Sequence, residues 1–205
     1  MTAPDAVVLD LGNVVVRWDP YLPYAGRMAR ADVDAFFADV DFPAFNHQQD
    51  AGRTWADARS EVADRFPQHL AALDLYVEHF AETLPGPVPG TADLVRDLRA
   101  GGTRVLGLTN WSAETFHHAA RVAPAVGLLE GVVVSGEVGV AKPDPRIFEV
   151  LARRFGLDPA RTVFADDSET NVEAAARLGF DALLFTSAAR LRTDLVARGI
   201  DLPTS

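Results

Sequence analysis

The chain has 205 residues, 48% of them hydrophobic and 23% charged, which excludes general disorder and allows a sizeable buried core. Its formal net charge of -10 argues against nucleic-acid partners and anionic membranes, because those surfaces attract clustered lysine and arginine. It has no cysteine, and we identify neither a signal peptide nor an apolar stretch long enough to span a bilayer. We expect a cytoplasmic protein, either a monomer or a homodimer.

Five short apolar runs predict the strands of a parallel sheet, since strands covered on both faces are apolar almost throughout. They span residues 6–10, 104–110, 131–135, 162–166 and 181–185. Segments with helical spacing of apolar residues occupy 91–102, 112–123, 144–156 and 168–180, and glycines lie near three of their ends. This alternation predicts a doubly wound α/β fold, in which a parallel sheet lies between two layers of helices.

The segment from 19 to 85 has a different pattern. Amphipathic helical spacing covers 21–40, 54–66 and 69–84, and no convincing strand lies among them. The proline- and glycine-rich residues 85–90 are suited to a stiff linker back into the sheet. We predict a core domain formed by 1–18 and 86–205, interrupted by a helical domain over 19–85.

Polar residues gather at the predicted strand ends. They are Asp10, Thr109, Asn110, Lys142, Asp166 and Asp167. A single acid at a strand end is most often a helix cap or a loop residue, but here four strand ends meet at one edge of the sheet. In doubly wound sheets, ligands bind beyond the carboxyl ends of the strands, so we expect a site there.

Three carboxylates in one crevice repel one another unless a cation lies between them, and hard oxygen ligands suit Mg²⁺. Lys142 and Thr109 offer a charge and a hydroxyl to phosphate oxygens, and we expect a helix beginning at Ser112 to add backbone N–H groups. An ionised Asp10 can act as a covalent nucleophile, because aspartate carboxylates form aspartyl-phosphates.

These residues resemble the motifs of the haloacid dehalogenase superfamily. DLGNV (10–14), LTN (108–110), AKPDPRIF (141–148) and FADDSETN (164–171) follow in the family's order and spacing, and the likeness covers nearly the whole chain. The set is highly specific, whereas DLGNV or LTN alone would be weak. The resemblance implies a sheet in the order 5-4-1-2-3 and a helical cap over 19–85.

The resemblance also implies roles for single residues. Asp10 is the nucleophile, Thr109 and Asn110 bind the transferring group, and Lys142 bridges that group to the nucleophile. Asp10, Asp166 and Asp167, together with the backbone carbonyl of Gly12, are expected to hold Mg²⁺. Asn171, one helical turn after Asp167, is expected to orient the acids of this metal site.

The sequence departs from the family at Gly12. Phosphatases of this superfamily usually carry an aspartate there that protonates the leaving group, which is typically worth about 10²–10⁴-fold in rate. DLGNV resembles a branch of sugar-phosphate phosphatases, including enzymes of glucose-1-phosphate, and we expect a substrate whose leaving group departs easily. Residues 45–55 of the cap contain His47 and Arg53, candidates for substrate contact, and His47 is a possible proton source; a solvated loop is an equally good reading of this segment.

We therefore expect a Mg²⁺-dependent phosphohydrolase of a small phosphorylated metabolite, working through an aspartyl-phosphate. One alternative is a 2-haloacid dehalogenase, which uses the same aspartate without metal. The paired acids at 166 and 167 argue against it, since the family's dehalogenases typically have serine and asparagine there. The other alternative is a non-catalytic homologue that binds a metabolite or a protein.

Overall fold

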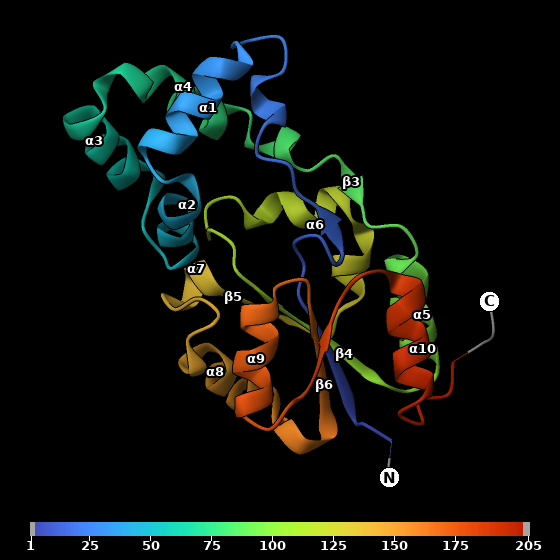
Figure 1. Cartoon of the computed structure of the whole chain (residues 1–205). Coiled ribbons are helices and arrows are strands. Elements are labelled where there is room, and N and C mark those ends of the chain that lie inside the picture. The colour runs from blue at the N-terminus through green and yellow to red at the C-terminus, as the bar shows by residue number, and fades with distance from the viewer. Residues whose placement is uncertain (1–2, 203–205) are drawn as a thin grey trace.

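A computed structural model describes residues 3–202 and contains one five-stranded parallel sheet (Figure 1). The strands, in spatial order, are β5 (Val132–Val134), β4 (Arg104–Thr109), β1 (Ala6–Leu9), β6 (Thr162–Asp166) and β7 (Asp181–Leu184). Numbered along the chain as five strands, this is the expected order 5-4-1-2-3. The doubly wound α/β prediction is confirmed, and its strand ends differ from the observed ones by only one residue.

Alternate residues of the sheet face two separate layers of helices. Val7 and Leu9 of β1 pack toward α5 (Thr91–Ala100) and α10 (Ala188–Val196). Ala6 and Val8 pack toward α8 (Pro145–Phe155) and α9 (Glu169–Arg177) on the opposite face. Because both faces are covered, every residue of β1 is buried and apolar, which explains the continuous apolar run in the sequence.

The prediction of a helix over 112–123 is wrong for most of these residues. Residues 113–115 form a turn, Phe116–His118 form a 3₁₀ turn, and only α6 (Ala119–Val122) is α-helical. The helix expected to begin at Ser112 is therefore absent from the described chain. The apolar residues of 112–123 belong to several short turns and not to one continuous helix. Their helical spacing in the sequence was therefore misleading.

Four α-helices form the insertion between β1 and β4, and they lie above the carboxyl end of the sheet in Figure 1. They are α1 (Arg30–Asp39), α2 (Phe42–Asp50), α3 (Trp55–Arg65) and α4 (Leu70–Glu78). Aromatic rings dominate their shared core; Phe37 and Phe42, for example, stack with ring centroids 4.0 Å apart. The helical insertion is confirmed, while the domain limits at 19 and 85 stay a prediction.

Helix α2 was not among the predicted helices, and this changes the interpretation of residues 45–55. The first six of these residues belong to α2, so a solvated loop is confined to the short turn before α3. The polar run at 46–50 hides the helical pattern in the sequence, but Phe42, Phe45 and Gln49 are buried at spacings of three and four along one face.

Two short strands join the insertion to the core. β2 (Val16–Arg17) pairs antiparallel with β3 (Gly86–Pro87), so the outgoing and returning segments lie side by side. Farther along, the turn after α2 approaches α7 (Ser135–Val138), where a Cβ on Gly52 would lie 3.3 Å from the carbonyl oxygen of Gly136. Among residues 3–202, no helix has the length and apolar character needed to cross a membrane.

Gly136 fixes how closely α7 approaches the loop after β4. A Cβ at this position would lie 2.4 Å from the backbone nitrogen of Ala113 and 2.7 Å from the carbonyl oxygen of Trp111. Backbone atoms cannot move aside as a flexible side chain does, so the loop that follows Asn110 depends on a glycine here.

We expect Gly136→Ala to lower the free energy of unfolding by about 1–3 kcal/mol, because the added methyl group overpacks against backbone. Urea denaturation measures the change. Gly127→Ala is the matched control, since a Cβ there meets no atom within 4 Å and it should be close to neutral. Equal stabilities of the two variants would contradict the close approach.

Candidate active site

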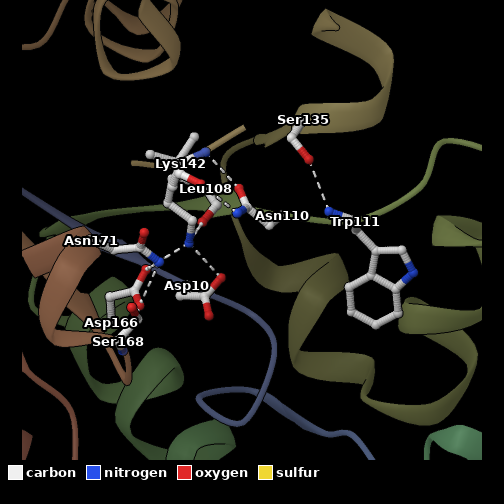
Figure 2. Close-up of polar contacts among 9 residues, drawn as sticks. All are labelled: Asp10, Leu108, Asn110, Trp111, Ser135, Lys142, Asp166, Ser168 and Asn171. Atoms are coloured by element: carbon white, nitrogen blue, oxygen red, sulfur yellow. Dashed lines mark hydrogen bonds and ion pairs between the residues drawn. The ribbon is translucent and has the colours of Figure 1, made fainter. Parts of the chain in front are cut away.

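Lys142 lies at the centre of the candidate site, at the carboxyl edge of the sheet. Its ammonium nitrogen Nζ donates to Asp10 Oδ1 at 2.8 Å, to Asp166 Oδ2 at 2.6 Å and to the carbonyl oxygen of Leu108 at 2.8 Å. Figure 2 shows the amine pointing between the two carboxylates. All three donor positions of the ammonium are used, and the side chain is only 1% exposed. Residues from four elements therefore meet at one cation, as the sequence predicted.

The backbone of Lys142 is held in place by Asn110. The Asn110 amide donates to the Lys142 carbonyl oxygen at 2.8 Å and accepts from the Lys142 backbone nitrogen at 2.8 Å (Figure 2). Asn110 directly follows β4, so the strand end fixes the loop that carries the lysine. Asn110 also lines the pocket described below, and its predicted contact with substrate stays a prediction.

Lys142 is also the only lysine in the sequence; the other 18 basic residues of the Lys and Arg total of 19 are arginines. An arginine is a poor substitute at this position, because its planar guanidinium directs donors in a fixed fork, whereas an ammonium is a compact point charge. Three acceptors surround one nitrogen in this site, and an ammonium group, with its three N–H donors on a single nitrogen, can bond all of them.

Burial and charge act in opposite directions on these groups. Burial raises the pKa of Asp10 to about 7; the Lys142 ammonium opposes this rise, and the neighbouring Asp166 carboxylate adds to it. Burial alone would lower the pKa of Lys142, but the carboxylates of Asp10 and Asp166 outweigh it and hold that pKa above its ordinary value. The lysine is thus a permanent cation, and further positive charge beside Asp10 would favour its ionised form.

Asp166 is the most firmly held acid of the site. Besides Lys142, it accepts from the backbone nitrogen of Ser168 at 2.8 Å and from the Asn171 amide at 3.1 Å on each oxygen. Asn171 lies on α9, one turn beyond the strand end that carries Asp166. The predicted orienting role of Asn171 agrees with this contact, which fixes the direction of the Asp166 carboxylate.

Asp167 is exposed and faces the loop after β1. A hydrogen bond from the Asn13 side chain works to lower its pKa, but partial burial and the Asp166 charge outweigh it and raise the pKa. Asn13 has a φ of 53°, and its Oδ1 also accepts from the backbone nitrogen of Trp18 at 3.1 Å. Asparagine tolerates this left-handed conformation better than most residues, which gives a local reason for Asn13.

The three acids form a group that suits a hard cation. One carboxylate oxygen from each of Asp10, Asp166 and Asp167 lies within 4.8 Å of the others. The oxygen-only donor set, the like charges and the raised pKa values all favour a bound divalent cation over an empty cluster. The residues therefore fit Mg²⁺, and Gly12, two positions after Asp10, is close enough in sequence to add its carbonyl oxygen.

Thr109 ends β4, and its hydroxyl oxygen is buried without a hydrogen-bond partner among the described residues. An unpaired buried hydroxyl is costly, typically by about 1–3 kcal/mol, so it is usually retained for a ligand or water. This is consistent with the predicted contact between Thr109 and a substrate oxygen, which stays a prediction.

A pocket of about 110 Å³ lies between this cluster and the cap. Core residues on its wall include Gly12, Asn110 and Ser112, and cap residues include Asn46 and Asp50. Its other wall residues are mainly aromatic: Trp18, Trp55, Phe80 and Trp111, with Thr115. The pocket thus combines polar residues from core and cap with aromatic side chains.

Asp50 is the acid that the cap contributes to this pocket. It ends α2, accepts from the Asn46 amide at 3.1 Å one turn earlier, and interacts with the backbone N–H of Ser112 in the core. Burial raises the pKa of Asp50 to about 7, helped by the Asp10 carboxylate and opposed by Lys142 and by the Ser112 N–H. Tyr76 of α4 faces it as a neutral phenol.

His47 and Arg53, the two cap residues predicted to bind substrate, are not among the residues that line the pocket. His47 is exposed on α2. Arg53 is bonded within the cap: it pairs with Glu61 and Gln49 and donates to the carbonyl oxygen of Phe45 at 3.2 Å. Substrate contact by either residue stays a prediction.

Asp50 lies within the segment 45–55 that the sequence singled out, but no role was predicted for it. The reason is the missed helix: once α2 is present, Asn46 and Asp50 are four residues apart on one face and point the same way. Asn13 was also given no role, although asparagine beside glycine after a strand is a signal for a left-handed turn.

Replacing Lys142 by methionine should lower the free energy of unfolding by about 3–5 kcal/mol, because two buried carboxylates lose their counter-charge. Urea denaturation near neutral pH in EDTA measures this. Arg59→Met is the control; it removes an exposed ion pair with Asp74 and should cost about 1 kcal/mol or less. Similar losses in the two variants would contradict a buried charge network.

Asp50→Asn tests the raised pKa of Asp50. The folded state holds the Asp50 proton more tightly than the unfolded chain, so its stabilising contribution is full below about pH 4 and is lost as the pH rises through about 7. The stability of the variant relative to wild type should therefore be higher near pH 8 than near pH 5, by about 1–3 kcal/mol. Urea denaturation in EDTA at both pH values measures the difference; a constant difference would argue against the shift.

Comparison with known proteins agrees with this geometry. The model of the haloacid dehalogenase-like hydrolase family matches residues 4–179. Sesquiterpene phosphatase astK of Aspergillus oryzae is 25% identical over 187 residues, covering 88% of this chain and 89% of that protein. Drimenol cyclase drtB of Aspergillus calidoustus is 25% identical over 188 residues, but the chain spans 34% of its length. Phosphatase MT3486 of Mycobacterium tuberculosis is 29% identical over 137 residues, covering 66% of this chain and 60% of that protein.

Solved structures share the fold. The enzyme bt-2542 of Bacteroides thetaiotaomicron, in complex with magnesium and inorganic phosphate, superposes with a TM-score of 0.71 at 22% identity, covering 90% of this chain and 96% of that one. A dehalogenase gives a TM-score of 0.71 at 17% identity, covering 94% and 97%. Because the family model spans most of the sequence and the fold agrees, this chain belongs to the haloacid dehalogenase-like hydrolases and is an enzyme of that family.

Proposed function

We propose that the protein is a Mg²⁺-dependent phosphohydrolase of a small phosphorylated metabolite, working through a phosphorylated Asp10. The observation that carries this proposal is the acid pair at 166 and 167 beside Asp10, with oxygens of all three acids within 4.8 Å. Such a cluster needs a divalent cation, and a cation there attracts phosphate oxygens. Relatives that are named phosphatases, astK and MT3486, support the same activity class.

In the first step, Asp10 attacks phosphorus in line with the leaving oxygen. Its Oδ1 is held by Lys142, which leaves Oδ2 as the attacking atom. The Lys142 ammonium and the Thr109 hydroxyl stabilise negative charge on the phosphoryl oxygens. When bound by Asp10, Asp166, Asp167 and the Gly12 carbonyl oxygen, Mg²⁺ supplies a further positive charge that neutralises the phosphate.

In the second step, water hydrolyses the phosphorylated Asp10 and releases inorganic phosphate. Lys142 contacts Asp10 Oδ1 and not the attacking Oδ2, so the regenerated carboxylate has a charged partner beside it. The cap lies over the pocket and limits access of bulk water, since Trp55 of α3 donates its backbone N–H to Glu114 of the core at 3.0 Å.

The pocket restricts the substrate. A space of about 110 Å³ admits a small group beside the phosphoryl, and aromatic walls with a few polar atoms suit the apolar and hydroxyl faces of a sugar. We therefore propose a sugar phosphate, with an anomeric phosphate such as glucose-1-phosphate as the leading candidate because its leaving group departs easily.

The fold does not separate a phosphatase from a 2-haloacid dehalogenase, because a dehalogenase shares it. The electrostatics favour the phosphatase. Displacement of halide by Asp10 gains nothing from two further acids nearby, and without a cation they would repel the substrate carboxylate of a haloacid.

Phosphate release from p-nitrophenyl phosphate and acetyl phosphate tests the proposal. We expect release with Mg²⁺, loss of release in EDTA, and loss in Asp10→Asn, which keeps the shape of the carboxylate but not its nucleophilicity. Chloroacetate serves as the contrasting substrate. Chloride release without metal would favour the dehalogenase, and no turnover of any substrate would favour a binding protein.

A further inference from the structure

Position 12 leaves an open space in the pocket. A Cβ on Gly12 would meet only Asp10 Oδ2, at 3.9 Å, and the backbone there is not in the left-handed region. A side chain would thus fit, yet the chain has none. The core residues that line the pocket, Gly12, Asn110, Trp111, Ser112 and Thr115, therefore include no carboxylic acid.

The cap contributes an acid to the wall of this pocket. Asp50 reaches the same pocket as Gly12 from the cap, at the end of α2. In an in-line displacement at Asp10, the leaving oxygen lies on the side of phosphorus away from the nucleophile. The pocket wall joins Gly12, from the loop that begins with Asp10, to Asp50 and Asn46 of the cap, so an acid of the cap and the nucleophile's loop share one space.

Hydrogen bonds hold Asp50 in this position from both domains. The Asn46 amide binds its Oδ2 at 3.1 Å, and the backbone N–H of Ser112 approaches it from the core. The Ser112 loop is in turn fixed by Trp111, whose backbone N–H donates to Ser135 Oγ at 2.9 Å (Figure 2). Asp50 is thus oriented when the cap lies on the core.

The surroundings of Asp50 favour its protonated form near neutral pH. Burial is the largest cause, and Asp10 adds to it; Lys142 and the Ser112 N–H act in the other direction, and Tyr76 is neutral. With its pKa raised to about 7, the carboxyl group holds a proton at the pH where it is needed and still releases it readily.

We propose that Asp50 is the general acid of this enzyme and replaces, from the cap, the aspartate that the core lacks at position 12. This inference rests on the proposed phosphohydrolase activity. As Asp10 Oδ2 forms its bond to phosphorus, the bond from phosphorus to the leaving oxygen breaks, and the Asp50 proton passes to that oxygen to give a free hydroxyl. The Asp50 carboxylate then takes a proton from the attacking water, which restores both acids.

A series of phosphate esters with graded leaving-group pKa tests this role. In Asp50→Asn, kcat for alkyl phosphates should fall by about 10²–10⁴-fold, while kcat for p-nitrophenyl and acetyl phosphate should fall little, because those groups leave without a proton. Wild-type kcat for alkyl phosphates should also decline as the pH rises through about 7, and this decline should vanish in the variant.

Two further variants make the result specific. Asp64→Asn changes an exposed cap acid outside the pocket and should leave the whole series unchanged. Adding Gly12→Asp to Asp50→Asn should restore much of the lost rate on alkyl phosphates, since the open space at position 12 admits an acid.

An equal loss on every ester in Asp50→Asn would overturn the inference and assign Asp50 to substrate binding; no loss on any ester would overturn it as well. Failure of the phosphohydrolase proposal is a separate result, because wild type would then release no phosphate even from p-nitrophenyl phosphate. The two failures are therefore distinguishable.

Discussion

The buried contact of Lys142 with Asp10 and Asp166 is the interaction on which the site depends. Ion pairs of this kind are expensive to desolvate, and they persist only where geometry and further hydrogen bonds are good. Here the lysine satisfies three acceptors, its backbone is bonded by Asn110, and Asp166 is held by Asn171. The strand order places Asp10, Asn110 and Asp166 together, because β1, β4 and β6, at whose ends they lie, are neighbours in the sheet.

The core and the cap contribute different groups to the site. The core supplies charges that cannot move, since its acids and lysine are fixed by strand ends and backbone bonds. The cap supplies the rest of the pocket, including aromatic walls and Asp50. An acid on the cap meets the core only when the two lie together, so the chemistry that we assign to Asp50 is linked to closure of the cap, whereas an acid at position 12 would not be.

The fold and the core of the site could be predicted because their signals are strong and local. Apolar runs ended by Asp10, Thr109 or Asp166 place the chemistry at one edge of a parallel sheet. Helix α2 was not predicted, because its apolar residues fall in the first turn, at 42–45, and residues 46–50 are all polar. The turn at Ser112 was predicted as a helix because apolar spacing does not show where the chain bends.

The single lysine has a practical consequence. Arginines make the surface ion pairs, such as those of Arg59 and Arg104, so the only side-chain ammonium group in the molecule is the one between Asp10 and Asp166. Protein grown on isotopically labelled lysine therefore carries one labelled residue, and its magnetic resonance signal comes from the active centre alone. The signal of this one residue therefore reports on the charge of the two carboxylates that it contacts.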